Sequence, residues 1–115
     1  MWLVMDERRG VVLRSERDGR DSRHLSAYID ESGDLHIDGQ DLGPGTAPMS
    51  GDGEYEWFQT VRAEYLPRLL EVLGADPDAD VLTFLQDNFA GAASRLLEPL
   101  IRASDVPMEF GSWSG

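Results

Sequence analysis

Hydrophobic residues in the first half of the chain recur at every second position, which is the pattern of a half-buried β-strand. Leu25, Ala27 and Ile29 alternate with polar residues, and Leu35 and Ile37 do the same after a short break. The two apolar sets must share one face of a sheet, so odd-numbered positions of one strand can pair only with odd-numbered positions of the other. We therefore predict an antiparallel hairpin in this region.

The loop of this hairpin predicts its register. Pairing Ile29 with Leu35 leaves the loop residues Glu31, Ser32 and Gly33, of which Gly33 supplies the left-handed conformation of a type I turn with a G1 bulge. The same register places three further pairs opposite one another: Ala27 and Ile37, Tyr28 and His36, and Ser26 and Asp38.

Between Tyr55 and Gly74 the hydrophobic period changes from two residues to about 3.6. The first part predicts a strand with Tyr55, Trp57 and Val61 on one face and Glu56, Phe58 and Thr60 on the other. The second part predicts a helix whose apolar stripe is Leu66, Leu69, Leu70 and Leu73. Pro67 lies near the first turn of this helix, and Gly74 lies where a left-handed cap would end it.

Two further helical segments follow. Asp76 is expected to cap the first of them, with Pro77 at the first helical position. Its buried stripe is Val81, Leu82, Leu85 and Phe89, with Phe84 at the margin. The second segment carries Leu96, Leu97, Leu100 and Ile101 and continues to Ala103. Pro99 removes one backbone hydrogen bond, so we expect a kink there.

A last alternating stretch, Val106, Met108 and Phe110, predicts a C-terminal strand. Pro107 cannot donate to a neighbouring strand, so this strand should lie at a sheet edge or start there. The whole pattern predicts a single α+β domain over residues 1–115. We expect an antiparallel sheet of four or five strands, two or three helices from the C-terminal half packed on one face, and a returning C-terminal strand.

Two segments are less regular. Residues 1–24 contain short strand-forming runs and are interpreted as a mobile hairpin, with Arg14–Arg23 as a polar loop or frayed strand end. Asp38–Gly45 is a dense run of turn formers, and we expect the connection over residues 39–53 to be either a functional loop or a disordered excursion.

The net charge of −12 is the strongest compositional feature. Residues 1–24 hold six of the ten arginines, whereas residues 25–115 hold four arginines against seventeen acids. Such a surface repels nucleic acid and anionic lipid and favours a cationic partner, although solubility alone would also account for it. There is no cysteine, which excludes disulfides and thiolate chemistry. No apolar run is long enough for a membrane span, and the opening residues do not form a secretory leader, so we expect a cytoplasmic protein.

Candidate chemistry centres on Asp34, His36 and Asp38, which recur at every second position of one strand. Such carboxylate and imidazole groups suit a divalent metal or a proton exchange, but they also suit an ordinary polar strand face with His36 opposite Tyr28. Only His24 is available as a second histidine, and neither histidine adjoins a nucleophile turn. The sequence also lacks a phosphate-binding loop, so an enzyme is the less favoured class, and no cofactor is expected.

The stretch Leu35–Gly43, followed by Tyr55–Trp57, Leu66–Gly74 and Val106–Trp113, resembles small acidic actinobacterial proteins described as uncharacterised. In size, acidity and order of elements the chain is also similar in style to immunity proteins of bacterial toxin systems. The second resemblance implies a partner protein, such as a toxin, and it carries over no functional residue.

We therefore expect a non-catalytic acidic binding protein, an immunity-type inhibitor that occludes a basic partner protein. The residues expected to bind are Tyr28, His36, Asp38, Gln40, Asp41, Asp52, Glu54 and Glu56. The alternative is a small-molecule or divalent-metal-binding protein, or a minor enzyme, that uses Asp34, His36 and Asp38. A homo-oligomer that pairs through the strand at residues 106–113 is a further reading.

Overall fold

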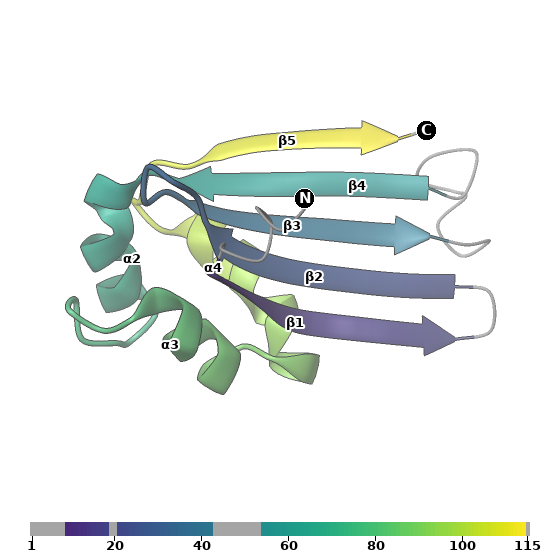
Figure 1. The fold of residues 1–115 in the computed structure, drawn as a ribbon, viewed down its shortest axis with the longest axis horizontal. Coiled ribbons are helices and arrows are strands. Elements are labelled where there is room, and N and C mark those ends of the chain that lie inside the picture. Colours follow the sequence, from purple (N-terminus) through teal and green to yellow (C-terminus); the bar gives the residue numbers. More distant parts are fainter. Residues whose placement is uncertain (1–8, 19–20, 43–53, 115) are drawn as a thin grey trace.

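The computed structural model describes residues 9–18, 21–42 and 54–114, which form one antiparallel sheet and a group of helices (Figure 1). The five strands, which lie side by side in chain order, are β1 (Arg9–Asp18), β2 (Asp21–Ile29), β3 (Leu35–Leu42), β4 (Glu54–Val61) and β5 (Glu109–Ser114). The helical elements are η3 (Ala63–Tyr65), α2 (Leu66–Val72), α3 (Val81–Asn88), η4 (Gly91–Leu96) and α4 (Leu97–Ala103). The predicted α+β class and the returning C-terminal strand are confirmed.

The hairpin of β2 and β3 has the predicted register. Ile29 pairs with Leu35, and the pairs of Tyr28 with His36 and of Ser26 with Asp38 follow. Gly33 has a φ of 86°, the left-handed conformation expected for this loop. The Asp30 N–H donates to the Asp34 carbonyl at 3.0 Å, which closes the loop at its base.

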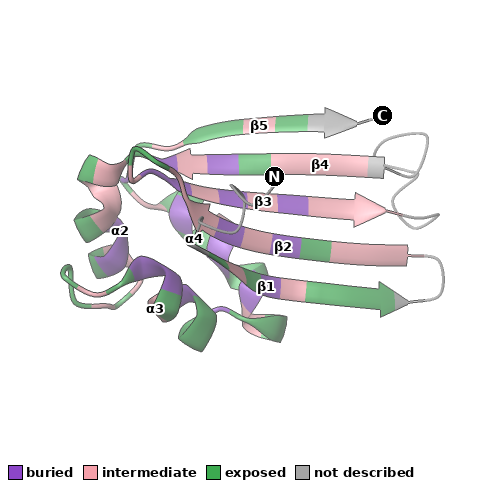
Figure 2. Ribbon diagram, in the orientation of Figure 1, coloured by how far each residue is buried: buried purple, intermediate pink, exposed green. Residues whose placement is uncertain are grey.

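The core lies between one face of the sheet and the helices. Leu25, Leu35 and Val61 from the strands pack against Leu69 and Leu97 from the helices, and all five are buried. Buried residues gather at the end of the sheet where β1, β3 and β5 begin, beside the helices (Figure 2). The far half of the sheet extends beyond the helices, so its side chains need not be apolar.

One prediction about the N-terminal part of the sheet is wrong. Arg14–Arg23 is not a loop, because β1 continues to Asp18 and β2 begins at Asp21. Its polar side chains are satisfied by partners on the helices and on β3. Glu16 pairs with Arg95 of η4 at 2.9 Å, and Arg23 pairs with Asp41 at 3.5 Å. Residues 1–8 lie outside the described residues.

The first part of the connection expected over residues 39–53 is also wrong, because β3 runs on through Gly39 to Leu42. Gly39 is buried, and a Cβ at this position would overlap the indole of Trp57, its neighbour on β4. The glycine therefore gives the Trp57 ring room on the sheet rather than starting a turn. The remainder of the predicted loop, residues 43–53, lies outside the described residues.

The helices begin and end partly as predicted. Pro67 lies in the first turn of α2, and Gly74 follows that helix with a φ of 91°. The cap of α3 is Asp80 rather than Asp76, since the Asp80 carboxylate accepts the Thr83 N–H at 3.0 Å. Asp76 instead caps a turn, in which its carboxylate accepts the Asp78 N–H at 2.8 Å.

Pro99 is the third residue of α4, so its missing N–H falls in the first turn, where N–H groups have no partner within that helix. The kink expected at Pro99 stays a prediction. Leu97 and Ile101 face the core as expected, whereas Leu96 and Leu100 are exposed. Among the described helices, none is long and apolar enough to cross a membrane.

Candidate functional site

The face of the sheet turned away from the core is the main candidate site, and we call it the open face. Alternation along the strands places on it the side chains that lie between the buried ones. These side chains are His24, Ser26 and Tyr28 of β2, His36, Asp38 and Gln40 of β3, and Glu56, Phe58 and Thr60 of β4. The described helices pack against the buried residues of the opposite face. Figure 1 shows α4 behind the strands and α2 and α3 beside one end of the sheet.

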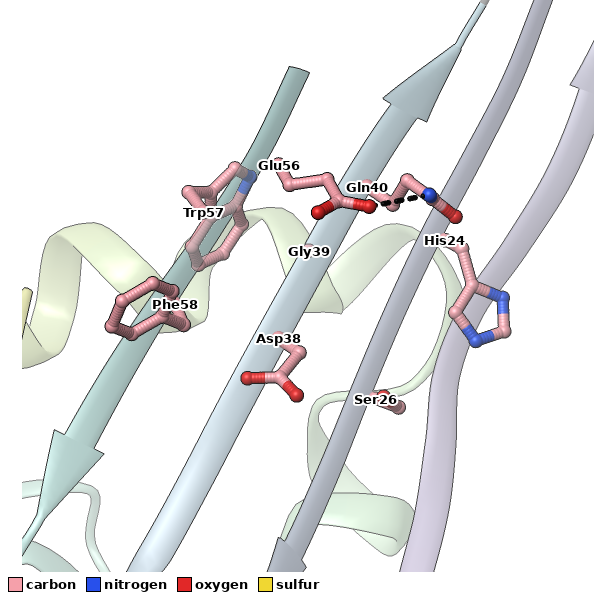
Figure 3. Close-up of a pocket in the computed structure, with 8 residues that line it drawn as sticks. All are labelled: His24, Ser26, Asp38, Gly39, Gln40, Glu56, Trp57 and Phe58. Carbon is pink, nitrogen blue, oxygen red and sulfur yellow. Dashed lines mark hydrogen bonds between the residues drawn. The ribbon is translucent and has the colours of Figure 1, made fainter. Parts of the chain in front are cut away.

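A shallow hollow of about 280 Å³ lies on the open face at the centre of the sheet. Its side chains come from the three central strands, and Figure 3 shows them: His24, Ser26, Asp38, Gln40, Glu56 and Phe58, with Gly39 and Trp57 completing the lining. Gln40 Nε2 donates to Glu56 Oε1 at 2.8 Å, so the amide holds this carboxylate in place. The hollow therefore presents two carboxylates, an imidazole and an aromatic ring.

Beside the hollow, His36 lies against three neighbours. Its Nε2 lies 2.7 Å from Asp30 Oδ2, its Nδ1 lies 3.4 Å from Thr60 Oγ1, and its ring stacks on Tyr28 with 4.7 Å between centroids. The hydrogen bond to His36 holds the pKa of the Asp30 carboxyl below its ordinary value. The Asp30 carboxylate also accepts the N–H groups of Ser32 and Asp34, so the network is tied to the loop.

Asp, His and Thr side chains in this order resemble a nucleophile activation chain, but the geometry does not support such a role. The 3.4 Å contact between Thr60 and His36 is long for a hydrogen bond. In addition, the Tyr28 ring stacks on one face of the His36 ring. The network is better described as a rigid polar support for the hairpin loop.

Five of the eight residues predicted to bind share the open face: Tyr28, His36, Asp38, Gln40 and Glu56. Asp41 points to the opposite side, where it pairs with Arg23. The backbone of Glu54 begins β4, but its side chain and the whole of Asp52 lie outside the described residues.

The alternative metal-ligand set of Asp34, His36 and Asp38 is not assembled. Asp34 precedes β3 and is buried, with its carboxylate accepting the Ala63 N–H at 2.8 Å and the Arg62 guanidinium at 3.1 Å. Asp34 thus ties the hairpin loop to the start of η3. Within the described ranges, no group of three or more His, Asp and Glu side chains could hold a metal ion.

Two features escaped the sequence analysis. Gln59 is completely buried on the core face of β4, where the predicted face contained only Tyr55, Trp57 and Val61. Phe58 lies over Gly111 of β5, since a Cβ at that glycine would overlap its ring. The signals were present in the sequence, because Gln59 interrupts an apolar series and Gly111 interrupts a strand.

No protein-family model matches the chain, and comparisons with curated proteins and with solved structures find no match either.

Proposed function

We propose that this protein is a non-catalytic binding protein that holds a basic partner protein against the open face, in the manner of an immunity-type inhibitor. The observation that carries the proposal is the combination of Asp38, Glu56 and the exposed ring of Phe58 on a strand face that no described helix covers. The net charge of −12 supports it, because such a charge attracts a cationic partner and repels nucleic acid.

The mechanism would be steric occlusion with electrostatic steering. Surface carboxylates accelerate the encounter with a basic surface, and close charge pairs then slow dissociation. Phe58 has 47% of its surface exposed, which provides apolar area for a contact and a ring face for a guanidinium. The sheet itself is a rigid platform, so binding would order few side chains and cost little entropy.

Binding of a metal or a small molecule through His36, Asp34 and Asp38 is less favoured. Asp34 is buried and holds two donors, and His36 is held by Asp30 and Tyr28. A ligand would have to break these contacts before it could bind.

The first experiment identifies the partner and tests its salt dependence. The immobilised chain is exposed to a lysate of the organism that encodes it, and retained proteins are eluted with rising salt. A purified retained protein is then titrated by calorimetry at low and high salt. We expect a basic protein whose affinity falls as salt rises. An affinity that does not change with salt would contradict the proposed mechanism.

A pair of matched variants then locates the contact. The double substitution Asp38→Asn and Glu56→Gln removes two carboxylates from the hollow, whereas Glu64→Gln and Asp87→Asn remove two exposed carboxylates from η3 and α3. Both variants change the net charge by the same amount. We expect the first to weaken binding about tenfold or more, equivalent to about 1.4 kcal/mol, and the second to have little effect. Equal effects would mean that only overall charge matters.

A further inference from the structure

The edge strand β5 is exposed along its outer side. β4 is its one neighbour in the sheet, and among the described residues no strand pairs with its other edge. Proteins commonly protect such edges with bulges, lysine or proline. The opposite edge strand, β1, has an irregularity between Val12 and Arg14. β5 pairs continuously with β4 and contains neither lysine nor proline, and its sequence, Glu-Phe-Gly-Ser-Trp-Ser, has one charged residue, Glu109, at its first position.

An aromatic ring lies beside this edge on each face of the sheet. On the open face, the Phe58 ring reaches across from β4 and covers Gly111 of β5. On the helix side, Phe110 has 46% of its surface exposed, and the Arg102 guanidinium lies 5.5 Å from its ring centroid. Apolar surface therefore continues to the edge on both sides, next to backbone groups of β5 with which no described strand pairs.

The charges near the edge favour a basic occupant. Glu109 begins β5, and its side chain is 65% exposed. The nearby cations are paired with acids: Arg62 with Asp34 and with Glu109 itself, and Arg102 with Glu98 at 2.7 Å. These two arginines face three carboxylates, so the group keeps one net negative charge. A second copy of this chain would bring another net charge of −12 to the same place, so self-pairing would be opposed by repulsion.

We infer that β5 accepts an extended segment of the basic partner as a sixth strand of the sheet. Basic side chains of that segment lie on the open-face side near Glu109 and Phe58, and its apolar side chains lie beside Phe110. Neighbouring strands are about 4.8 Å apart, which brings alternate side chains of the added strand beside the rings that cover β5. When a strand is added to a sheet edge, backbone hydrogen bonds supply the affinity and alternate side chains supply the selectivity. The inference rests on the proposed function, because it states how the basic partner is held.

The test uses three capped hexapeptides as probes. In the first, arginine alternates with valine. The second has the same side chains, but all of its backbone nitrogens are methylated, so neither edge can donate hydrogen bonds to a strand. The third replaces arginine with glutamate. Binding is followed by NMR through the amide shifts of the whole chain and the hydrogen-exchange rates of residues 109–114.

We expect the first peptide to shift the β5 amides and to slow the exchange of those that point outward. At nine-tenths occupancy the slowing is about tenfold, because exchange then occurs from the free fraction. The methylated and acidic peptides should leave the β5 exchange rates unchanged. These three results together would show that binding at β5 needs both backbone pairing and positive charge.

The other outcomes overturn the inference in distinguishable ways. If both arginine peptides shift only the amides around Asp38 and Glu56, the open face binds cations but β5 adds no strand, and the proposed function survives. If the acidic peptide pairs with β5 as well as the basic one, the requirement for a basic partner fails. If sedimentation shows a dimer whose β5 amides are protected without peptide, the occupant is a second copy. If no peptide binds, both the inference and the charge complementarity that supports the proposed function are lost.

Discussion

Gln59 provides the sharpest test of how this fold is stabilised. The residue is fully buried between Trp57 and Val61 on β4, and it pairs with Ile37 on one side and Phe110 on the other. Among the described residues, neither its Oε1 nor its Nε2 has a hydrogen-bond partner. An amide removed from water without compensation destabilises the folded state. We therefore predict that Gln59→Met, which keeps the length and shape of the side chain, stabilises the protein.

The size of the effect follows from the number of unpaired groups. Each unsatisfied buried polar group costs about 1–3 kcal/mol, and partial relaxation of the amide should keep the total gain within that same range. For a chain of this size, 1 kcal/mol corresponds to about 4 °C in melting temperature, so we expect a rise of about 4–12 °C. The free energy of unfolding from urea titration should increase while the m value stays the same, because the surface exposed on unfolding is unchanged.

Gln40→Met is the matched control. Gln40 lies on the open face of the adjacent strand and donates to Glu56, so its replacement removes a hydrogen bond that is made. We expect this control to lower the free energy of unfolding by about 0.5–1.5 kcal/mol. If Gln59→Met also lowered stability by about 1 kcal/mol or more, the amide of Gln59 would have a partner in solution, and the account of an unsatisfied core residue would be refuted.

Three other substitutions test the supports of the site. Gly39→Ala should lower the free energy of unfolding by about 1–3 kcal/mol and shift the tryptophan fluorescence, because the new methyl group displaces the Trp57 indole. The control Gly10→Ala has room for a Cβ, so its stability and fluorescence should stay close to those of the wild type. Asp34→Ala should lower the free energy of unfolding, measured by urea titration, by about 1–3 kcal/mol, because it leaves the Ala63 N–H unpaired. An unchanged free energy would show that Asp34 does not tie the loop to η3. Asp30→Asn keeps the backbone hydrogen bonds of the loop but loses the charge beside His36. The pKa of Asp30 lies below its ordinary value of 3.8 in the folded state. The Asp30 carboxylate therefore contributes fully to the free energy of unfolding above pH 3.8, and this contribution is lost as the pH falls through the folded pKa. The stability difference between wild type and Asp30→Asn should therefore shrink below about pH 3.8, and a difference that persists in acid would contradict it.

The central hairpin could be predicted to the residue because two constraints agreed there. Alternation of Leu25, Ala27 and Ile29 fixed the face, and Gly33 fixed the loop, so the pairing of Tyr28 with His36 followed. The open face could be recognised for the same reason. Its polar residues are the ones that alternate with the core residues along each strand.

The rest depended on contacts that a single strand does not reveal. The polar run Arg14–Arg23 looked like a loop because its side chains find their partners on other elements, Glu16 on η4 and Arg23 on β3. Asp76 and Asp80 are both good caps by sequence, and the turn that Asp76 forms with Asp78 decides between them. Gly39 resembled a turn residue because the space it leaves is filled by Trp57 from another strand.

Thiol protection tests most directly whether a basic partner covers the open face. The chain has no cysteine, so single cysteines can be introduced at Ser26, which lines the hollow, and at Gln86, which is exposed on α3. The rate of maleimide labelling is measured for each variant with and without the purified partner. We predict that saturating partner slows labelling of the Ser26→Cys variant about tenfold or more and leaves the Gln86→Cys variant unchanged. Unchanged labelling of the Ser26→Cys variant in a formed complex would show that the partner binds elsewhere.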